Sequence, residues 1–243
     1  MANKVLFTSN KGGVGVTTVC INLAYCFAEE GLKTLIVDGD EKSSCTLTVA
    51  GCANLQVFNF DDLKNGACRA KQLLIEHPTK PNLYFLSTQN CFDQNLIERA
   101  VLEVEGLFDF IFLDKCCEKI CDRAVVILEP FAPSIKSAND KICELDGNKI
   151  KDIGVIINRV NGGHVYDGEI MPPQEIAYLL RRDLCAVIPE DLLLPLGKIK
   201  LKTLKSFKCA ALSLLKKSNK IYPVIKGYYG VYGYFKRKLR RAL

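Results

Sequence analysis

The segment "NKGGVGVTT", from Asn10 to Thr18, holds the residues of this chain that are best suited to chemistry on an anion. It lies between an apolar stretch, "VLFTS", and a helical pattern that begins near Thr17. Gly12, Gly13 and Gly15 permit left-handed backbone and let N–H groups approach a phosphate closely. The N-terminus of the following helix adds a partial positive charge at the same point. The segment therefore predicts a phosphate-binding loop, with the Thr17 hydroxyl placed to reach a phosphate-bound Mg²⁺.

Apolar runs rich in β-branched residues alternate along the chain with amphipathic patterns of helical period. Such runs are typical of strands buried on both faces of a parallel sheet. The alternation predicts an α/β fold: a doubly wound, mostly parallel sheet with helices on both faces and ligands at the carboxyl ends of its strands. The predicted strands are residues 4–9, 33–38, 82–87, 108–114, 123–128 and 152–158, and the predicted helices are Val19–Glu30, Asp93–Val104, Ser134–Leu145 and Pro173–Leu180.

The bulk composition suits a large α/β domain. The chain has 243 residues, of which 49% are apolar, enough to bury a sizeable core. We find no run of about eighteen apolar residues and no signal-peptide pattern at the start of the sequence. A cytosolic chain is therefore expected.

Several motifs, in the same order, resemble those of the MinD/ParA-type ATPases, the deviant Walker A family whose loop reads KGGxGKT. Beyond the loop these are "LIVDGDEK", "FDFIFLD", "EPFAPSIKSANDKI", "IINRV" and "PPQEIAYLLRRDLCAVIPED". The resemblance spans about residues 3–191 and is closest to MinD-like members. It implies a P-loop NTPase fold and an adenine nucleotide with Mg²⁺ as ligand. We expect a nucleotide-binding domain over residues 1–191, a basic helix that completes it over 192–226, and a basic amphipathic tail over 227–243.

The resemblance also implies roles for individual residues. Lys11 would be the signature lysine that reaches the phosphates of the partner subunit in a nucleotide-sandwich homodimer, and Asp40 would help to position the attacking water. Thr17 would ligate Mg²⁺, with Asp38 and Asp114 near the metal through water. The nucleotide-binding residues carried over are Lys11, Gly12, Gly13, Val14, Gly15, Val16, Thr17, Thr18 and Asn158, the last beside the adenine.

Two departures from the family pattern weaken the expectation of hydrolysis. Val16 stands where the Walker lysine touches the terminal phosphates, and loss of such a cation costs about a hundred- to thousandfold in rate. Lys11, Lys42 or Lys115 could compensate in part. The segment "KCCEKIC" after Asp114 is also shorter than the family's switch. We therefore predict nucleotide binding with weak or absent ATP hydrolysis; the alternative is a loop that keeps its geometry and binds nothing.

Twelve cysteines are scattered through the strand and helix patterns. Buried free thiols are the interpretation that fits a chain without a signal. A second interpretation starts from Cys121, which follows the Walker B aspartate as the cluster-ligating cysteine does in the distantly related nitrogenase iron proteins. With Cys91 it could supply two thiolates per subunit for an iron–sulfur cluster or zinc. The absence of a CxxC pair makes that metal site the less favoured reading.

The charge of the chain is divided unevenly. Residues 192–243 carry fourteen Lys or Arg and no acid, so residues 1–191 carry 19 basic residues against 27 acids. A helix in the first part of this basic region would place on one apolar face Ile199, Leu204, Phe207, Ala211 and Leu214/Leu215. The terminal stretch interleaves aromatic and basic residues, which is typical of an interfacial membrane helix. The predicted membrane residues are Tyr228, Tyr232, Phe235, Lys236, Arg237, Lys238, Leu239, Arg240 and Arg241.

These features together predict a cytoplasmic protein held peripherally on the inner face of the cell membrane. There it would position or scaffold a partner such as a division, pilus or secretion assembly. Two alternatives remain open at this point. One is a ParA-type partition protein whose basic tail binds DNA. The other is a metal or iron–sulfur ATPase of the nitrogenase iron protein type.

Overall fold

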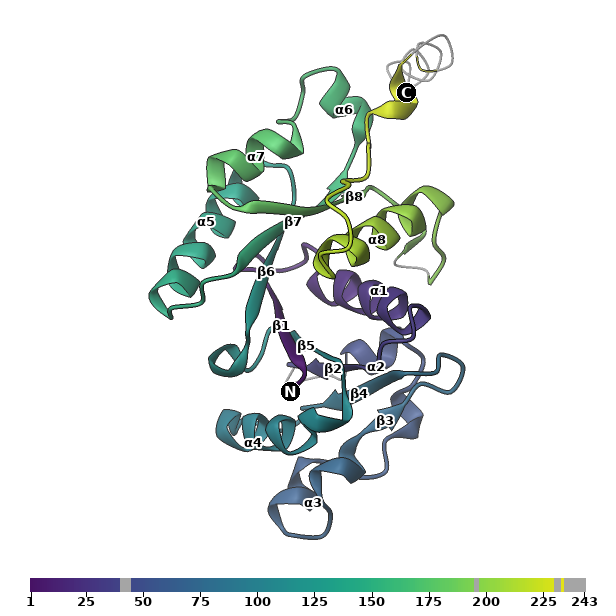
Figure 1. Ribbon diagram of the computed structural model, residues 1–243, viewed down its shortest axis with the longest axis vertical. Helices are drawn as coiled ribbons and strands as arrows, with labels where there is room; N and C mark the ends of the chain where they lie inside the picture. Colours follow the sequence, from purple (N-terminus) through teal and green to yellow (C-terminus); the bar gives the residue numbers. More distant parts are fainter. Residues whose placement is uncertain (40–44, 195–196, 230–232, 234–243) are drawn as a thin grey trace. The chain divides into compact units, whose positions relative to one another are not determined.

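The computed structural model describes residues 1–39, 45–194, 197–229 and 233. The eight described strands form one sheet in the order β3-β4-β2-β5-β1-β6-β7-β8 (Figure 1). The α/β prediction is confirmed, as are the six predicted strands, which correspond to β1, β2, β4, β5, β6 and β7. The strands are β1 (Asn3–Thr8), β2 (Thr34–Asp38), β3 (Ile75–Glu76), β4 (Leu83–Ser87), β5 (Phe110–Asp114), β6 (Arg123–Leu128), β7 (Ile153–Val160) and β8 (Asp183–Pro189).

Helices connect these strands, and the four predicted ones are confirmed as α1, α4, α5 and α7. The described α-helices are α1 (Val16–Glu29), α2 (Cys45–Val49), α3 (Phe60–Lys64), α4 (Gln94–Val104), α5 (Ala132–Gly147), α6 (Gly162–Tyr166), α7 (Pro173–Leu180) and α8 (Leu201–Leu214). Short 3₁₀ turns lie at Ala53–Leu55, Ala70–Leu73, Glu105–Leu107, Glu118–Ile120 and Lys226–Tyr228.

The chain divides into two compact units. The first unit comprises Met1–Ser9, Gly15–Val125 and Glu144–Ile153, and the second unit comprises Asn10–Val14, Val126–Cys143 and Gly154–Leu243.

Parallel strands with continuous apolar sequences form the centre of the first unit. β2 pairs in parallel with both β4 and β5, and β5 pairs in parallel with β1, whereas the short β3 pairs antiparallel with β4. Phe7, Phe27 and Phe112 are at most 1% exposed. The Phe112 ring meets the other two edge to face, with centroids 4.9 and 5.0 Å apart. This aromatic cluster packs α1 against β1 and against β5, whose end carries the predicted metal residue Asp114.

In the second unit β7 pairs in parallel with β8, and α7 and α8 pack on β8. Figure 1 shows α8 lying alongside β8. Phe207 and Ala211 are buried, as the apolar stripe predicted, and the Ser206 hydroxyl donates to the Val187 carbonyl oxygen at 2.6 Å. Ile199 was wrongly assigned to this stripe, because the helix begins only at Leu201 and Ile199 is 37% exposed.

Phe112→Ala is expected to lower the free energy of unfolding by about 3–5 kcal/mol, because it opens a cavity among rings that cannot collapse fully. Denaturant unfolding measures the loss. Phe92→Ala is the matched control, since Phe92 is 70% exposed in the same unit and its truncation should stay within about 0.5 kcal/mol. Equal losses in the two variants would contradict this picture of the core.

Candidate functional site

The glycine-rich loop joins β1 to α1 and has the backbone that its sequence predicts. Gly13 and Gly15 take φ values of 78° and 93°, in the left-handed region that other residues enter at a cost. A Cβ at Gly12 or Gly13 would meet nothing within 4 Å, so the space beside the loop is open there. The glycines therefore allow the backbone to turn here, and they leave open space beside the loop in which a ligand can bind.

α1 begins at Val16, directly after the left-handed Gly15. The first-turn N–H groups of a helix have no intrahelical acceptor and carry the positive end of its dipole, which favours an anion. Thr17 lies in this first turn with a half-buried side chain. The Val16 side chain is only 3% exposed, so the position of the Walker lysine is occupied by a buried apolar group.

In the second unit, Lys11 belongs to a cluster of charges that the sequence analysis missed. Its ammonium lies 3.2 Å from Glu129 Oε2, and the Arg159 guanidinium lies 2.8 Å from Glu129 Oε1. Glu129 follows β6, and its N–H donates to the Ser134 hydroxyl at 3.0 Å. The carboxylate of Glu129 therefore sits between two cations, one of them Lys11, the predicted signature lysine.

Burial alone would raise the pKa of the Glu129 carboxyl. The hydrogen bonds donated by Arg159 and Lys11, together with their charges, outweigh that cost and hold the pKa below the ordinary value of 4.5. The Glu129 carboxyl is consequently ionised at neutral pH. Arg159 itself has a φ of 55°, an uncommon value for a non-glycine residue, at the end of β7.

Asn158 is buried beside the loop segment of the same unit. Its side-chain amide donates to the Val14 carbonyl oxygen at 2.8 Å, and its side-chain oxygen accepts the Arg159 N–H at 2.9 Å. Lys11, Val14 and Asn158 thus belong to one hydrogen-bonded arrangement. The predicted contact of Asn158 with adenine stays a prediction.

The two predicted metal-associated aspartates are neighbours in the first unit. Asp38 ends β2 and Asp114 ends β5, and they are register partners in the parallel pair. Both are buried, at 1% and 2% exposure. Asp38 Oδ2 accepts the Thr46 N–H at 2.7 Å and its hydroxyl at 2.8 Å. Thr46, like Glu129, is a residue of the candidate site that the sequence motifs did not indicate.

Gly39 is required for the approach of these two strand ends. Its N–H donates to the Asp114 carbonyl oxygen at 3.0 Å. A Cβ at position 39 would overlap that oxygen and the Cβ of Cys116. The glycine of "DGD" is therefore a packing requirement, which the sequence analysis did not assign.

The segment after Asp114 makes a tight turn rather than an extended switch. Lys115 and Cys117 both have positive φ, 61° and 55°, before the 3₁₀ turn at Glu118–Ile120. The Cys116 thiol is buried and donates to the Val37 carbonyl oxygen at 3.7 Å. Hydrogen bonding with Cys117 and burial raise the pKa of Cys116 well above its ordinary value, so it is a neutral packing thiol.

Cys91 is buried, and Cys121 is partly exposed. Burial, with the nearby charges of Glu118 and Asp122, raises the pKa of Cys121 to about 11. Across residues 1–39, 45–194, 197–229 and 233, no group of three or more His, Cys, Asp or Glu is placed to hold a metal ion. A magnesium site does not need such a group, because Mg²⁺ keeps several waters and is bound through one or two carboxylates plus phosphates.

Some predicted residues lie outside the described part of the chain. Asp40 is one of them, as is Lys42. Tyr228 is described, half-buried in a 3₁₀ turn of the second unit. The remaining predicted membrane residues lie outside the described part of the chain: Tyr232, Phe235, Lys236, Arg237, Lys238, Leu239, Arg240 and Arg241.

A strand, a glycine-rich loop and a helix N-terminus, with aspartates at the ends of two neighbouring parallel strands, define a P-loop type of nucleotide-binding protein. The CobQ/CobB/MinD/ParA nucleotide binding domain family matches residues 5–197. The chain belongs to this family of nucleotide-binding ATPases.

Individual relatives agree with this assignment. The septum site-determining protein MinD of Thermotoga maritima is 31% identical over 207 residues, which cover 79% of this chain and 76% of that protein. The MinD cell division protein of Aquifex aeolicus superposes with a TM-score of 0.82 at 22% identity, over 91% of this chain and 100% of the other. MinD of Pyrococcus horikoshii, complexed with Mg-ADP, superposes with a TM-score of 0.77 at 23% identity, over 89% and 97%.

Glu129→Gln is expected to lower the free energy of unfolding at pH 7 by about 1 kcal/mol, because two partly exposed cations lose their carboxylate. The folded-state pKa of Glu129 lies below 4.5, so its contribution is complete above pH 4.5. It is lost as the pH falls through the folded-state pKa. Urea unfolding measured from pH 7 down to pH 3 should therefore show that the free energies of unfolding of the native protein and of Glu129→Gln converge at acid pH.

Glu175→Gln provides the control for this experiment, because Glu175 is exposed on α7 in the same unit. This variant should leave the free energy of unfolding at pH 7 nearly unchanged. Its decrease between pH 7 and pH 3 should also match that of the native protein. A loss in Glu175→Gln as large as that in Glu129→Gln would rule out a specific role for the Lys11–Glu129–Arg159 cluster.

Proposed function

We propose that this protein binds an adenine nucleotide with Mg²⁺ at the glycine-rich loop and hydrolyses ATP weakly or not at all. The observation that carries the proposal is Val16, which begins α1 and has a buried side chain where the family has its Walker lysine. Backbone N–H groups of the loop and the first turn of α1 would bind the phosphates. Without a lysine at position 16, the charge that develops on the terminal phosphates is stabilised less well.

The donor set at the ends of β2 and β5 fits magnesium. Asp38 and Asp114 are buried carboxylates side by side, and hard oxygen ligands are what Mg²⁺ prefers. Thr17, in the first turn of α1, would supply a hydroxyl ligand. The bound ion would neutralise phosphate charge and orient the nucleotide. The Mg-ADP complex of the Pyrococcus horikoshii relative supports this assignment.

Lys11 would act across a nucleotide-dependent homodimer and contact the phosphates of the partner subunit. Within its own chain it is paired with Glu129, and 40% of the Lys11 side chain is exposed. A partly exposed ion pair contributes about 1 kcal/mol or less, so a phosphate can replace the carboxylate as the partner of Lys11. Dimerisation would therefore exchange one ion pair for another.

The basic C-terminal tail would hold the protein on an anionic membrane surface, where it would position or scaffold a partner protein. No helix in the described part of the chain is both long enough and apolar enough to cross a membrane. Residues 227–243 combine four tyrosines and one phenylalanine with five Lys or Arg, the composition of an interfacial anchor. The septum-site role in the names of the MinD relatives supports a positioning function.

Val16→Lys is expected to raise the rate of ATP hydrolysis by about a hundredfold or more, because it restores a cation at the developing charge. Phosphate release by the purified protein at saturating MgATP measures this rate. Lys136→Gln, on the exposed side of α5, controls for a change of charge elsewhere. Rapid hydrolysis by the native protein, unchanged by Val16→Lys, would contradict the proposed weak ATPase.

Deletion of residues 230–243 is expected to abolish co-sedimentation with phosphatidylglycerol vesicles, because the deleted residues contain five basic side chains. The deletion leaves Tyr229 in place, whose ring packs against Tyr166 with centroids 5.2 Å apart. Unchanged co-sedimentation with the vesicles would contradict the proposal that the tail is a membrane anchor. Tail-dependent binding to a DNA duplex with a steep salt dependence, without vesicle binding, would instead select the DNA-partition function.

A further inference from the structure

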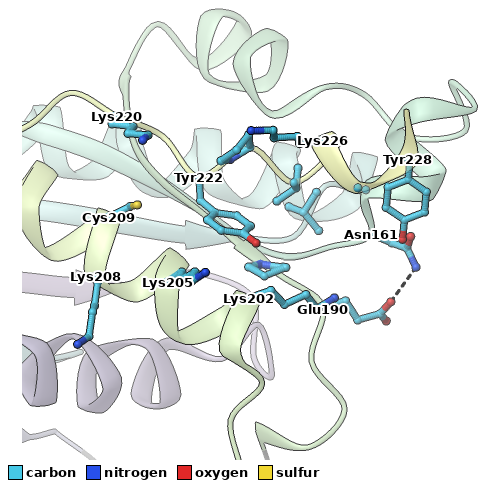
Figure 2. Close-up of a pocket in the computed structure, with 16 residues that line it drawn as sticks. Asn161, Glu190, Lys202, Lys205, Lys208, Cys209, Lys220, Tyr222, Lys226 and Tyr228 are labelled. Atoms are coloured by element: carbon cyan, nitrogen blue, oxygen red, sulfur yellow. Dashed lines mark hydrogen bonds between the residues drawn. The ribbon is translucent and has the colours of Figure 1, made fainter. Parts of the chain in front are cut away.

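A hollow of about 790 Å³ in the second unit has a strongly basic lining (Figure 2). Its walls come from the β7–α6 connection, the end of β8, the exposed side of α8 and the segment from Lys220 to Tyr228. In the described part of the chain, five lysines and one carboxylate, that of Glu190, line it. The lysines are Lys202, Lys205, Lys208, Lys220 and Lys226. This lysine pocket has no part in the nucleotide function proposed above.

One wall of the lysine pocket is a fixed helical ridge. Lys202, Lys205 and Lys208 follow each other at intervals of three on α8, which places them along one side of the helix. The opposite side of α8 is buried on β8. The Asp191 carboxylate accepts the N–H groups of Lys200 at 2.9 Å and Leu193 at 3.1 Å, which fixes the approach to the helix.

The other wall is an irregular segment held against α6. A Cβ at Gly162 would overlap the carbonyl group of Val224 and crowd the Tyr228 ring, so the glycine permits their close approach. Tyr166 and Tyr229 then meet edge to face, with an interplanar angle of 80°. These contacts give the pocket a second wall with defined geometry.

Aromatic and apolar groups lie between the lysines. Figure 2 shows Lys205 and Tyr222 pointing into the space between α8 and the C-terminal segment. Pro189 and Val224 also line the pocket. The carboxylate of Glu190 accepts a hydrogen bond from the Asn161 amide at 3.0 Å. Burial, and to a lesser extent Cys209, raises the pKa of the Tyr222 phenol, which therefore remains a neutral hydrogen-bond donor.

The chemistry of this lining selects an anion with an apolar part. Several ammonium groups around a concavity with low-dielectric walls concentrate positive potential inside it. The volume falls within the range of about 300–1,000 Å³ that is typical of small-molecule sites. A nucleic-acid backbone is bound along extended basic surfaces, whereas Lys205 and Tyr222 point into one hollow.

We propose that the lysine pocket binds a phosphate group carried on an apolar body, with Lys205 and Lys226 contacting the phosphate and Tyr222 beside the body. The headgroup of an anionic lipid and a free phosphorylated solute both have this chemistry. The described lining of the pocket contains no residue of the nucleotide loop, so the pocket can exist whether or not the loop binds nucleotide.

Calorimetric titration of the full-length protein tests the proposal with two probes: short-chain phosphatidylglycerol below its aggregation concentration, and phenyl phosphate. Each titration is run with and without saturating MgATP. The pocket variant is Lys205→Gln/Lys226→Gln, and Lys205→Arg/Lys226→Arg should retain binding. The control variant is Lys136→Gln/Lys216→Gln, which removes the same charge from exposed positions of the same unit outside the pocket.

The pocket variant should lose at least about tenfold in affinity for one or both probes, while the control variant stays within about twofold. A loss confined to phosphatidylglycerol assigns the lipid headgroup, and a loss confined to phenyl phosphate assigns a free phosphorylated solute. The proposal is overturned if neither probe binds, if both variants lose affinity equally, or if MgATP displaces the probe. Lysine-dependent binding of a DNA duplex without binding of either probe would also overturn it.

Discussion

The parallel pairing of β2 with β5 is the interaction on which the metal half of the candidate site depends. It places Asp38 beside Asp114 at the strand ends. It also demands glycine at position 39, because the backbone there approaches the Asp114 carbonyl more closely than a side chain permits. The cysteine-rich turn after Asp114 follows from the same packing, since the buried Cys116 lies against the end of β2. The arrangement is fixed by sterics and strand register before any ligand binds.

The placement of positive charge distinguishes this chain from the motif it resembles. Position 16 is occupied by a buried valine where the motif has a lysine. The loop segment from Asn10 to Thr18 therefore carries a single lysine, Lys11. That lysine is stabilised by Glu129, which also pairs with Arg159. On our account the loop retains the backbone geometry and dipole that bind phosphate, and it lacks the cation that accelerates transfer. On this proposal, nucleotide binding and ATP hydrolysis are separated at residue 16.

The sequence predicted those features that depend on periodicity and local motif. Continuous apolar runs and the glycine spacing were sufficient for the six confirmed strands and for the loop, since both signals are local. Thr46 and Glu129 were missed because their importance arises from contacts across the fold, to Asp38 and Lys11. The start of α8 was misplaced because apolar spacing alone extends a helix to Ile199, whereas Asp191 binds the backbone just before Leu201. The lysine pocket had no sequence signal beyond charge, because its second wall depends on the tertiary contact at Gly162.

The central claim is that the loop binds nucleotide without a lysine at position 16. Calorimetric titration of MgATP into the native protein and into Lys11→Ala tests it most directly. The account predicts micromolar binding to the native protein and a loss of roughly tenfold in Lys11→Ala, from the removal of a charged contact. No binding to the native protein, or equal binding to both proteins, would contradict it.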